Sequence, residues 1–156
     1  MNATELFFDT IRKGLNNRLK PQISNSPEIV NTKDMRGFTP LIFATYFSNN
    51  DATEILLNHG AEVDAKDASG NTALLGVCFK GNVELAQLLI THGAKIDAQN
   101  NQGITPLIYA TMYNQEAIVR LLLKQNVDTT LGDNSGKTAI DYAKEKGFNN
   151  LEAMLS

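Results

Sequence analysis

The sequence predicts an all-α fold in which short repeats stack on one another, and three observations carry this prediction. Four glycines recur every 33 residues along the 156-residue chain. A threonine follows each glycine by two positions, and two apolar segments of helical length lie between successive glycines. A fixed period of this length is typical of stacked repeat proteins, in which neighbouring repeats cover one another's apolar faces. The glycines are Gly37, Gly70, Gly103 and Gly136, and the threonines are Thr39, Thr72, Thr105 and Thr138.

Composition and charge are those of one ordinary globular domain, with 42% hydrophobic and 20% charged residues. A net charge of −3 argues against a nucleic acid or an anionic membrane surface as partner. The longest apolar run, residues 73–79, is too short to span a bilayer, and acidic residues interrupt the N-terminus, unlike a signal peptide. Cys78 is the only cysteine, so no intrachain disulfide can form, and we expect a reducing, cytoplasmic location.

Each repeat is expected to begin with a tight turn that leads into its first helix. An Asp or Asn followed three residues later by Gly suits such a turn, because Gly can take a positive φ. The threonine hydroxyl is placed to accept a hydrogen bond from a backbone N–H in the first helical turn. Pro40 and Pro106 then occupy the first helical position, where a missing N–H costs nothing. The turns begin at Asp34, Asp67, Asn100 and Asp133.

Two helices per repeat follow from the apolar segments. The first helix is predicted at residues 41–47, 74–79 and 107–113, and the second at residues 51–58, 83–91 and 116–124. Gly60 and Gly93 are expected to end two of the second helices, with Asn126 in the same place in the third, because both residue types tolerate the left-handed conformation.

The two ends of the chain depart from the repeat, as terminal caps should. The first unit lacks its turn, and Pro21 is expected to break its second helix early, so this end is expected to fray. The last unit exchanges apolar for charged residues, which suits a solvent-facing end. We therefore predict a single domain over residues 1–156, divided into units 1–34, 35–67, 68–100, 101–133 and 134–156.

These residues resemble the ankyrin repeat family. Thr39-Pro40-Leu41 leads to Leu56-Leu57-Asn58-His59-Gly60-Ala61-Glu62-Val63-Asp64, and the matching columns extend over essentially the whole chain. The resemblance implies antiparallel helix pairs joined by outward-pointing β-hairpin turns and stacked into a curved solenoid. One departure is that the family's common histidine after the Leu column is absent, which is expected to loosen the turns. Ile42, Leu75, Ile108 and Asp141 stand there instead.

The same resemblance implies a non-catalytic protein–protein interaction module, a scaffold or adaptor that binds through its concave face and turn tips. An inhibitor or immunity-type protein that blocks a specific enzyme with the same surface is the alternative. We expect another protein as partner, and neither nucleic acid nor membrane. A monomer is expected, with a homodimer through exposed aromatic residues as the alternative.

The predicted binding surface is unusually aromatic, since Tyr46, Phe79 and Met112 share one column of the first helix. A contiguous exposed apolar patch of this kind marks a protein interface. The alternative is that these side chains fill gaps between repeats, because Gly76 interrupts a column of large aromatic residues and leaves a void. The candidate protein-binding residues are Arg36, Phe38, Tyr46, Phe47, Asn71, Phe79, Lys80, Ile104, Met112 and Tyr113.

No residue pattern predicts catalysis, and we expect no catalytic residue, cofactor or metal. His59 and His92 lie one repeat apart, about 8–10 Å in packed helices, which is too far to share a zinc ion. They are expected to stabilise helix C-termini. Asp64 and Asp97 are expected to be solvated turn residues, and Cys78 a buried structural thiol. The chain also contains no phosphate-binding or metal-binding motif.

Overall fold

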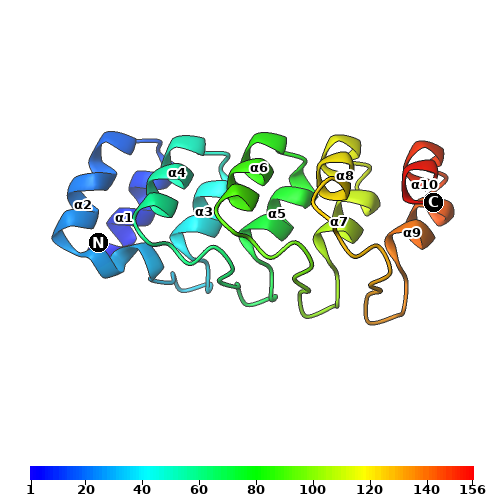
Figure 1. Ribbon diagram of the computed structural model, residues 1–156. Helices are drawn as coiled ribbons and strands as arrows, with labels where there is room; N and C mark the ends of the chain where they lie inside the picture. Colours follow the sequence, from blue (N-terminus) through cyan, green and yellow to red (C-terminus); the bar gives the residue numbers. More distant parts are fainter.

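The computed structural model describes residues 1–156, and its helices form five pairs in a single row with the termini at opposite ends (Figure 1). The first helices of the pairs are α1 (Ala3–Arg12), α3 (Pro40–Tyr46), α5 (Ala73–Lys80), α7 (Pro106–Met112) and α9 (Ala139–Lys146). The second helices are α2 (Leu19–Asn25), α4 (Asn50–Asn58), α6 (Val83–Thr91), α8 (Glu116–Leu123) and α10 (Asn149–Leu155). Two short 3₁₀ turns, η1 (Asn16–Arg18) and η2 (Pro27–Asn31), flank α2.

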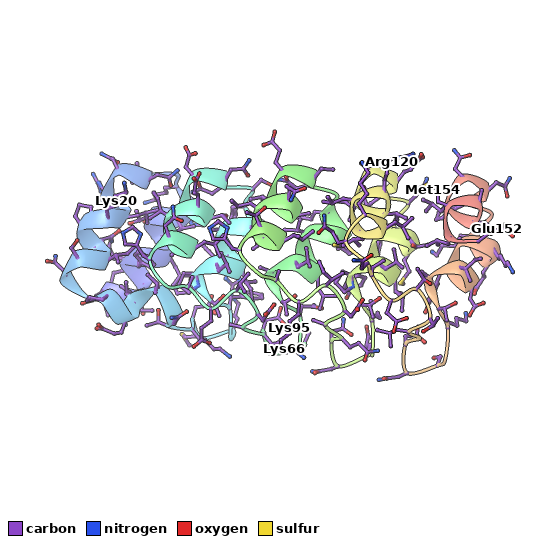
Figure 2. All side chains as sticks on the ribbon, viewed as in Figure 1. Lys20, Lys66, Lys95, Arg120, Glu152 and Met154 are labelled. Atoms are coloured by element: carbon purple, nitrogen blue, oxygen red, sulfur yellow. The ribbon has the colours of Figure 1, made fainter.

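Helices of one kind pack against helices of the same kind in the neighbouring pairs, so that α3 contacts α1 and α5, and α6 contacts α4 and α8. The buried apolar side chains form a core that runs along the whole row. Side chains fill the spaces between successive pairs (Figure 2). The predicted all-α solenoid is confirmed. None of its helices combines the length and apolar character that a membrane crossing requires.

The turns between the pairs project from one side of the row (Figure 1) and are closed by the side chain that begins each of them. In the first turn, Oδ1 of Asp34 accepts the N–H groups of Arg36 and Phe38, each at 2.9 Å. The three later turns repeat this pair of bonds. No residue is in a β-strand. The turns are therefore closed in all four places without the histidine that the sequence lacks.

The predicted start and end signals of the helices are largely confirmed. Thr39, Thr72 and Thr105 each accept the N–H three residues ahead, at 3.1 to 3.3 Å. Thr138 differs, because its N–H and its hydroxyl both donate to Asp141 at 3.0 and 3.1 Å. Gly60, Gly93 and Asn126 have φ values of 89°, 87° and 57° just beyond the second helices, as expected for residues that end a helix.

The predicted break at Pro21 is wrong. Pro21 lies in the first turn of α2, where the backbone N–H has no partner within the helix and proline is tolerated. The N-terminal unit is also well packed, since Phe7, Ile11 and Leu19 are completely buried. The last unit, residues 134–156, buries only two alanines and Leu151 among its apolar residues. Burial therefore favours fraying at the C-terminal end.

We predict that the backbone amides of α9 and α10 exchange with deuterium faster than those of α1 and α2. The reason is the smaller apolar area that the last unit buries against its single neighbour. Exchange measured by NMR or mass spectrometry on the intact chain checks this. Equal or stronger protection of residues 134–156 would contradict it.

We predict that two substitutions of glycines at positive φ lower the free energy of unfolding by different amounts. Gly60→Ala has open space around the new Cβ and should cost about 1–2 kcal/mol for the left-handed conformation alone. In Gly70→Ala the Cβ would lie 2.8 Å from the backbone nitrogen of Asn101 in the next turn. We expect Gly70→Ala to lower the free energy of unfolding by at least about 1 kcal/mol more than Gly60→Ala, because the new Cβ would lie too close to this atom. Urea unfolding of both variants measures the difference, and equal losses would refute the close approach of the turns.

Candidate functional site

Four exposed aromatic side chains gather at the C-terminal ends of the first helices. Tyr46 and Phe47 lie at the end of α3, Phe79 near the end of α5, and Tyr113 directly after α7. Their exposed fractions are 60%, 42%, 43% and 46%, respectively. We call these four residues the aromatic face.

The rings of the aromatic face contact one another and the rings beneath them. The ring centroids of Phe79 and Tyr113 are 4.3 Å apart, and those of Phe79 and Tyr109 are 6.0 Å apart, both edge to face. Tyr46 and Phe47 contact each other in the same manner at 5.1 Å. Such pairs contribute about 0.5–1.5 kcal/mol each beyond area burial. The ring of Phe79 thus packs against the next repeat, the rings of Tyr46 and Phe47 pack within one repeat, and all four side chains still leave roughly half of their surface to solvent.

Two predicted binding residues are less exposed than the sequence suggested. Ile104 is only 6% exposed and belongs to the apolar core, so its expected exposure at a turn tip is wrong. Its position next to the buried Thr105 cap explains this, because the turn re-enters the stack there. Met112 is half-buried and packs against the core. Neither side chain is part of the aromatic face.

Basic side chains lie over several of the rings. The guanidinium carbon of Arg36 is 4.9 Å from the ring centroid of Phe38, and Arg36 also pairs with Asp34 at 3.2 Å. Nζ of Lys80 lies 4.0 Å from the ring centroid of Tyr46 and donates to the backbone oxygen of Tyr46. These cation–π contacts hold the charged groups beside the apolar surface.

Two pockets hollow this part of the molecule, with volumes of about 410 and 290 Å³. Phe38, Ile42 and Tyr46 line both pockets and so form the wall between them. The larger pocket is completed by Arg12, Arg36, Phe43 and Phe47. The smaller one is completed by Thr45, Asp67, Asn71, Thr72, Ala73, Gly76, Phe79, Lys80 and Tyr109.

The smaller pocket is the void that the glycine in the aromatic column predicts. Gly76 is exposed, and a Cβ placed on it would meet no atom within 4 Å. No neighbouring side chain has moved in to fill the space. Sequence reasoning missed Asp67 and Tyr109 as pocket residues, although each belongs to a column that repeats every 33 residues.

The residues weighed for chemistry have structural roles. Nδ1 of His59 and of His92 lies 2.7 and 2.9 Å from a backbone oxygen four residues earlier, at the C-terminal ends of α4 and α6. Oδ1 of Asp64 accepts the N–H of Lys95 at 2.9 Å, and Asp97 makes the equivalent bond one repeat later at 3.1 Å. The two aspartates therefore join successive repeats.

Cys78 is completely buried, and burial raises the pKa of its thiol above the ordinary range. The chain contains no cluster of three or more His, Cys, Asp or Glu side chains arranged to hold a metal ion.

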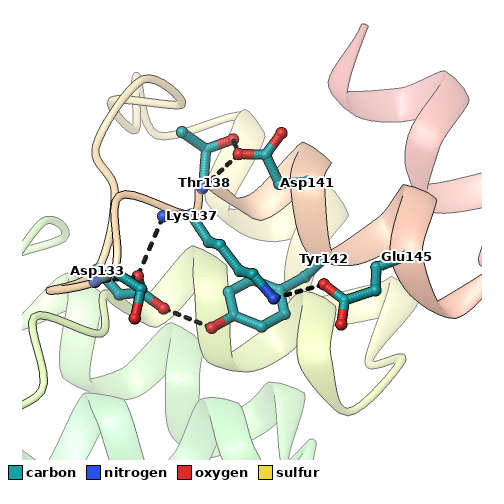
Figure 3. A network of polar contacts seen from close by, with 7 residues as sticks. Asp133, Lys137, Thr138, Asp141, Tyr142 and Glu145 are labelled. Atoms are coloured by element: carbon teal, nitrogen blue, oxygen red, sulfur yellow. Dashed lines mark hydrogen bonds and ion pairs between the residues drawn. The ribbon is translucent and has the colours of Figure 1, made fainter.

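The last turn carries a polar network that ties it to α9 (Figure 3). The hydroxyl of Tyr142 donates to Oδ2 of Asp133, and Nζ of Lys137 pairs with Glu145 at 2.6 Å. The hydrogen bond to Asp133 raises the pKa of Tyr142 to about 12, because the phenol loses this bond when it ionises. Partial burial and the negative charges of Asp133 and Glu145 shift the pKa in the same direction. Partial burial raises the pKa of Asp133, but the Tyr142 hydroxyl and the turn N–H groups lower it more, so the net shift is downward.

Comparison with known families gives a match that extends over most of the chain. A family model described as ankyrin repeats, in three copies, matches residues 8–100 and again residues 74–156. The two matches overlap and together extend from residue 8 to the last residue of the chain. Comparison with curated proteins found no significant match.

We predict that Tyr142 ionises at about pH 12, whereas an ordinary tyrosine ionises at about pH 10. Since its folded pKa is the higher one, Tyr142 contributes stability that is complete below about pH 10 and is lost as the pH rises through 12. Absorbance titration at alkaline pH, compared between the wild type and Tyr142→Phe, isolates this group, and circular dichroism checks that the chain stays folded. Asp133→Asn should return the pKa toward 10. An ordinary Tyr142 titration in the wild type would contradict the Asp133 bond.

Proposed function

This chain belongs to the ankyrin repeat family, and on that basis we propose that it binds another protein through the aromatic face and the neighbouring turns. Ankyrin repeats are generally protein–protein interaction modules, and their stacking creates an extended binding surface. The observation that carries the proposal is the aromatic face itself. Four large aromatic side chains, each between 42% and 60% exposed, lie together beside two pockets.

The composition of this surface supports a protein partner. Tyrosine, phenylalanine and arginine are enriched in the centres of protein interfaces, where they supply most of the binding energy. The rings of Phe79 and Tyr113 already brace each other, and Lys80 is held by Tyr46. Binding therefore costs little side-chain entropy, since these groups are ordered before the partner arrives.

We propose an adaptor or scaffold that acts as a monomer in the cytoplasm, without catalytic activity of its own. An inhibitor of a specific enzyme would use the same surface, and an activity assay of the captured partner distinguishes the two roles. Light scattering over a range of concentrations tests the monomer. Net charge of −3 supports a protein rather than a nucleic acid as partner.

We predict that Tyr46→Glu and Phe79→Glu each weaken partner binding by about 30-fold or more, which corresponds to about 2 kcal/mol. A charge at either position would be desolvated inside the interface. The partner is obtained by affinity purification from the native host, and its dissociation constant is then measured by titration.

Ala117→Glu is the matched control, because Ala117 is exposed on the second helix α8, away from the aromatic face. We expect the control to bind like the wild type. Each variant is checked by thermal unfolding, and only variants that remain folded are compared. Unchanged affinity of both aromatic-face variants would rule out this surface.

A further inference from the structure

The residue that begins each turn stands nine positions before the aromatic column of the first helix, and in two of the four repeats the two side chains form a hydrogen bond. In the last repeat the Tyr142 hydroxyl donates to Oδ2 of Asp133 (Figure 3). In the repeat before it, Nδ2 of Asn100 donates to the hydroxyl of Tyr109 at 3.2 Å. The tyrosine ring therefore fills the space beside the turn, and its hydroxyl satisfies the turn residue.

The other two repeats carry aspartate in the turn but no tyrosine. Asp34 faces Phe43, which has no hydroxyl, and its Oδ2 is paired instead with the guanidinium of Arg36 at 3.2 Å. Asp67 faces Gly76. Its Oδ1 accepts the N–H groups of Ser69 and Asn71, each at 2.9 Å, while no donor of the protein bonds to its Oδ2.

The repeat of Asp67 lacks both an aromatic side chain, at Gly76, and a tyrosine hydroxyl that could donate to Asp67, and both positions lie at the same pocket. Asp67 and Gly76 line the cavity of about 290 Å³ described above. Tyr46 and Lys80 stand on one side of it, from the ends of α3 and α5, and Tyr109 lines it from the next repeat. Most of the surface inside the pocket is apolar, and its charged groups are the carboxylate of Asp67 and the ammonium of Lys80, which lies over the ring of Tyr46. Its neutral polar lining residues are Thr45, Asn71 and Thr72.

We propose that this pocket receives a tyrosine side chain from the protein partner, with the phenol hydroxyl donating to Oδ2 of Asp67. The inserted ring takes the place that Tyr109 and Tyr142 occupy in their own repeats, and so completes the interrupted column. This inference rests on the proposed function and specifies the chemistry of the partner at one point of the same surface.

The carboxylate selects tyrosine among the side chains that fit an apolar space. A phenylalanine fills the volume but leaves Oδ2 without a donor while covering it from water, which is unfavourable. An acidic or phosphorylated side chain would place negative charge against Asp67. A phenol supplies both the ring and the donor, as Tyr142 does opposite Asp133.

Small-molecule probes test the pocket directly. We expect p-cresol, the side chain of tyrosine, to shift the amide NMR signals of Gly76 and Asp67 in a saturable manner in the millimolar range, as suits so small a ligand. The probe 4-methylanisole has a similar shape but cannot donate a hydrogen bond. Because a hydrogen bond to a charged group is lost, we expect it to bind about tenfold more weakly.

Gly76→Tyr is expected to abolish p-cresol binding by filling the pocket from within, whereas Ala117→Tyr, on the exposed surface of α8, should leave it unchanged. No saturable shift at Gly76, or equal affinity for the two probes, would overturn the proposal.

A second measurement uses the stability of filled pockets. Gly76 has an ordinary helical conformation with open space at its Cβ, so larger residues fit without strain. Replacing a helical glycine should raise Tm by about 2–4 °C. Gly76→Tyr should exceed Gly76→Phe in Tm, and Asp67→Ala should remove that difference. Equal Tm values for the Tyr and Phe variants would show that the hydroxyl does not reach Asp67 and would refute the proposal.

The outcomes separate this inference from the proposed function. If Phe79→Glu prevents binding of the purified partner while Gly76→Tyr leaves the affinity for that partner unchanged, the inference fails and the proposed function stands. If p-cresol binds at Gly76 but no aromatic-face variant changes partner affinity, the proposed function fails. A homodimer that Gly76→Tyr dissociates would assign the pocket to a second copy of this chain and overturn the proposal of a different protein as occupant.

Discussion

No helix pair of this chain buries its apolar residues alone, and the stacking of one pair on the next is the constraint on which the structure depends. From Asp34 onward the repeats follow one another at a constant spacing of 33 residues. Nζ of Lys33 donates to the backbone oxygen of Lys66, and Lys66, whose side chain lies on the side of the turns (Figure 2), donates to that of Gln99. Gln99 continues the series to Gly132 at 3.2 Å. Equivalent residues therefore form straight rows along the molecule.

These rows explain why small differences between repeats produce surface features. A row of identical residues gives a uniform surface, and one changed residue alters it at a single place. A pocket lies at Gly76, where the neighbouring repeats carry Phe43 and Tyr109, because no neighbouring side chain fills the space that an aromatic residue would take. Arg36 likewise changes the first turn, where it neutralises Asp34 and covers Phe38. The partner is therefore recognised, in our proposal, at places where the repeats differ.

Much of the fold could be predicted because the signals are local. A threonine cap, a proline at the first helical position and a glycine beyond the last turn depend only on bonds within a few residues. The error at Pro21 has the opposite cause. Helix α2 begins at Leu19, later than its repeat equivalents, so that Pro21 falls in its first turn, and no local signal in the sequence located this start. The predicted exposure of Ile104 is wrong because burial of a turn residue depends on the neighbouring repeat.

The sequence by itself determined the period, the start and end of most helices, and which residues share a row. It also marked the missing aromatic residue at position 76. Only the tertiary structure decided which side chains of a row remain exposed, that the space at Gly76 stays open, and that Asp67 lines this space with its turn bonds made by Oδ1. The physical reason is that a row is a property of spacing along the chain. Exposure and hydrogen bonding depend instead on side chains from three successive repeats packing together in space.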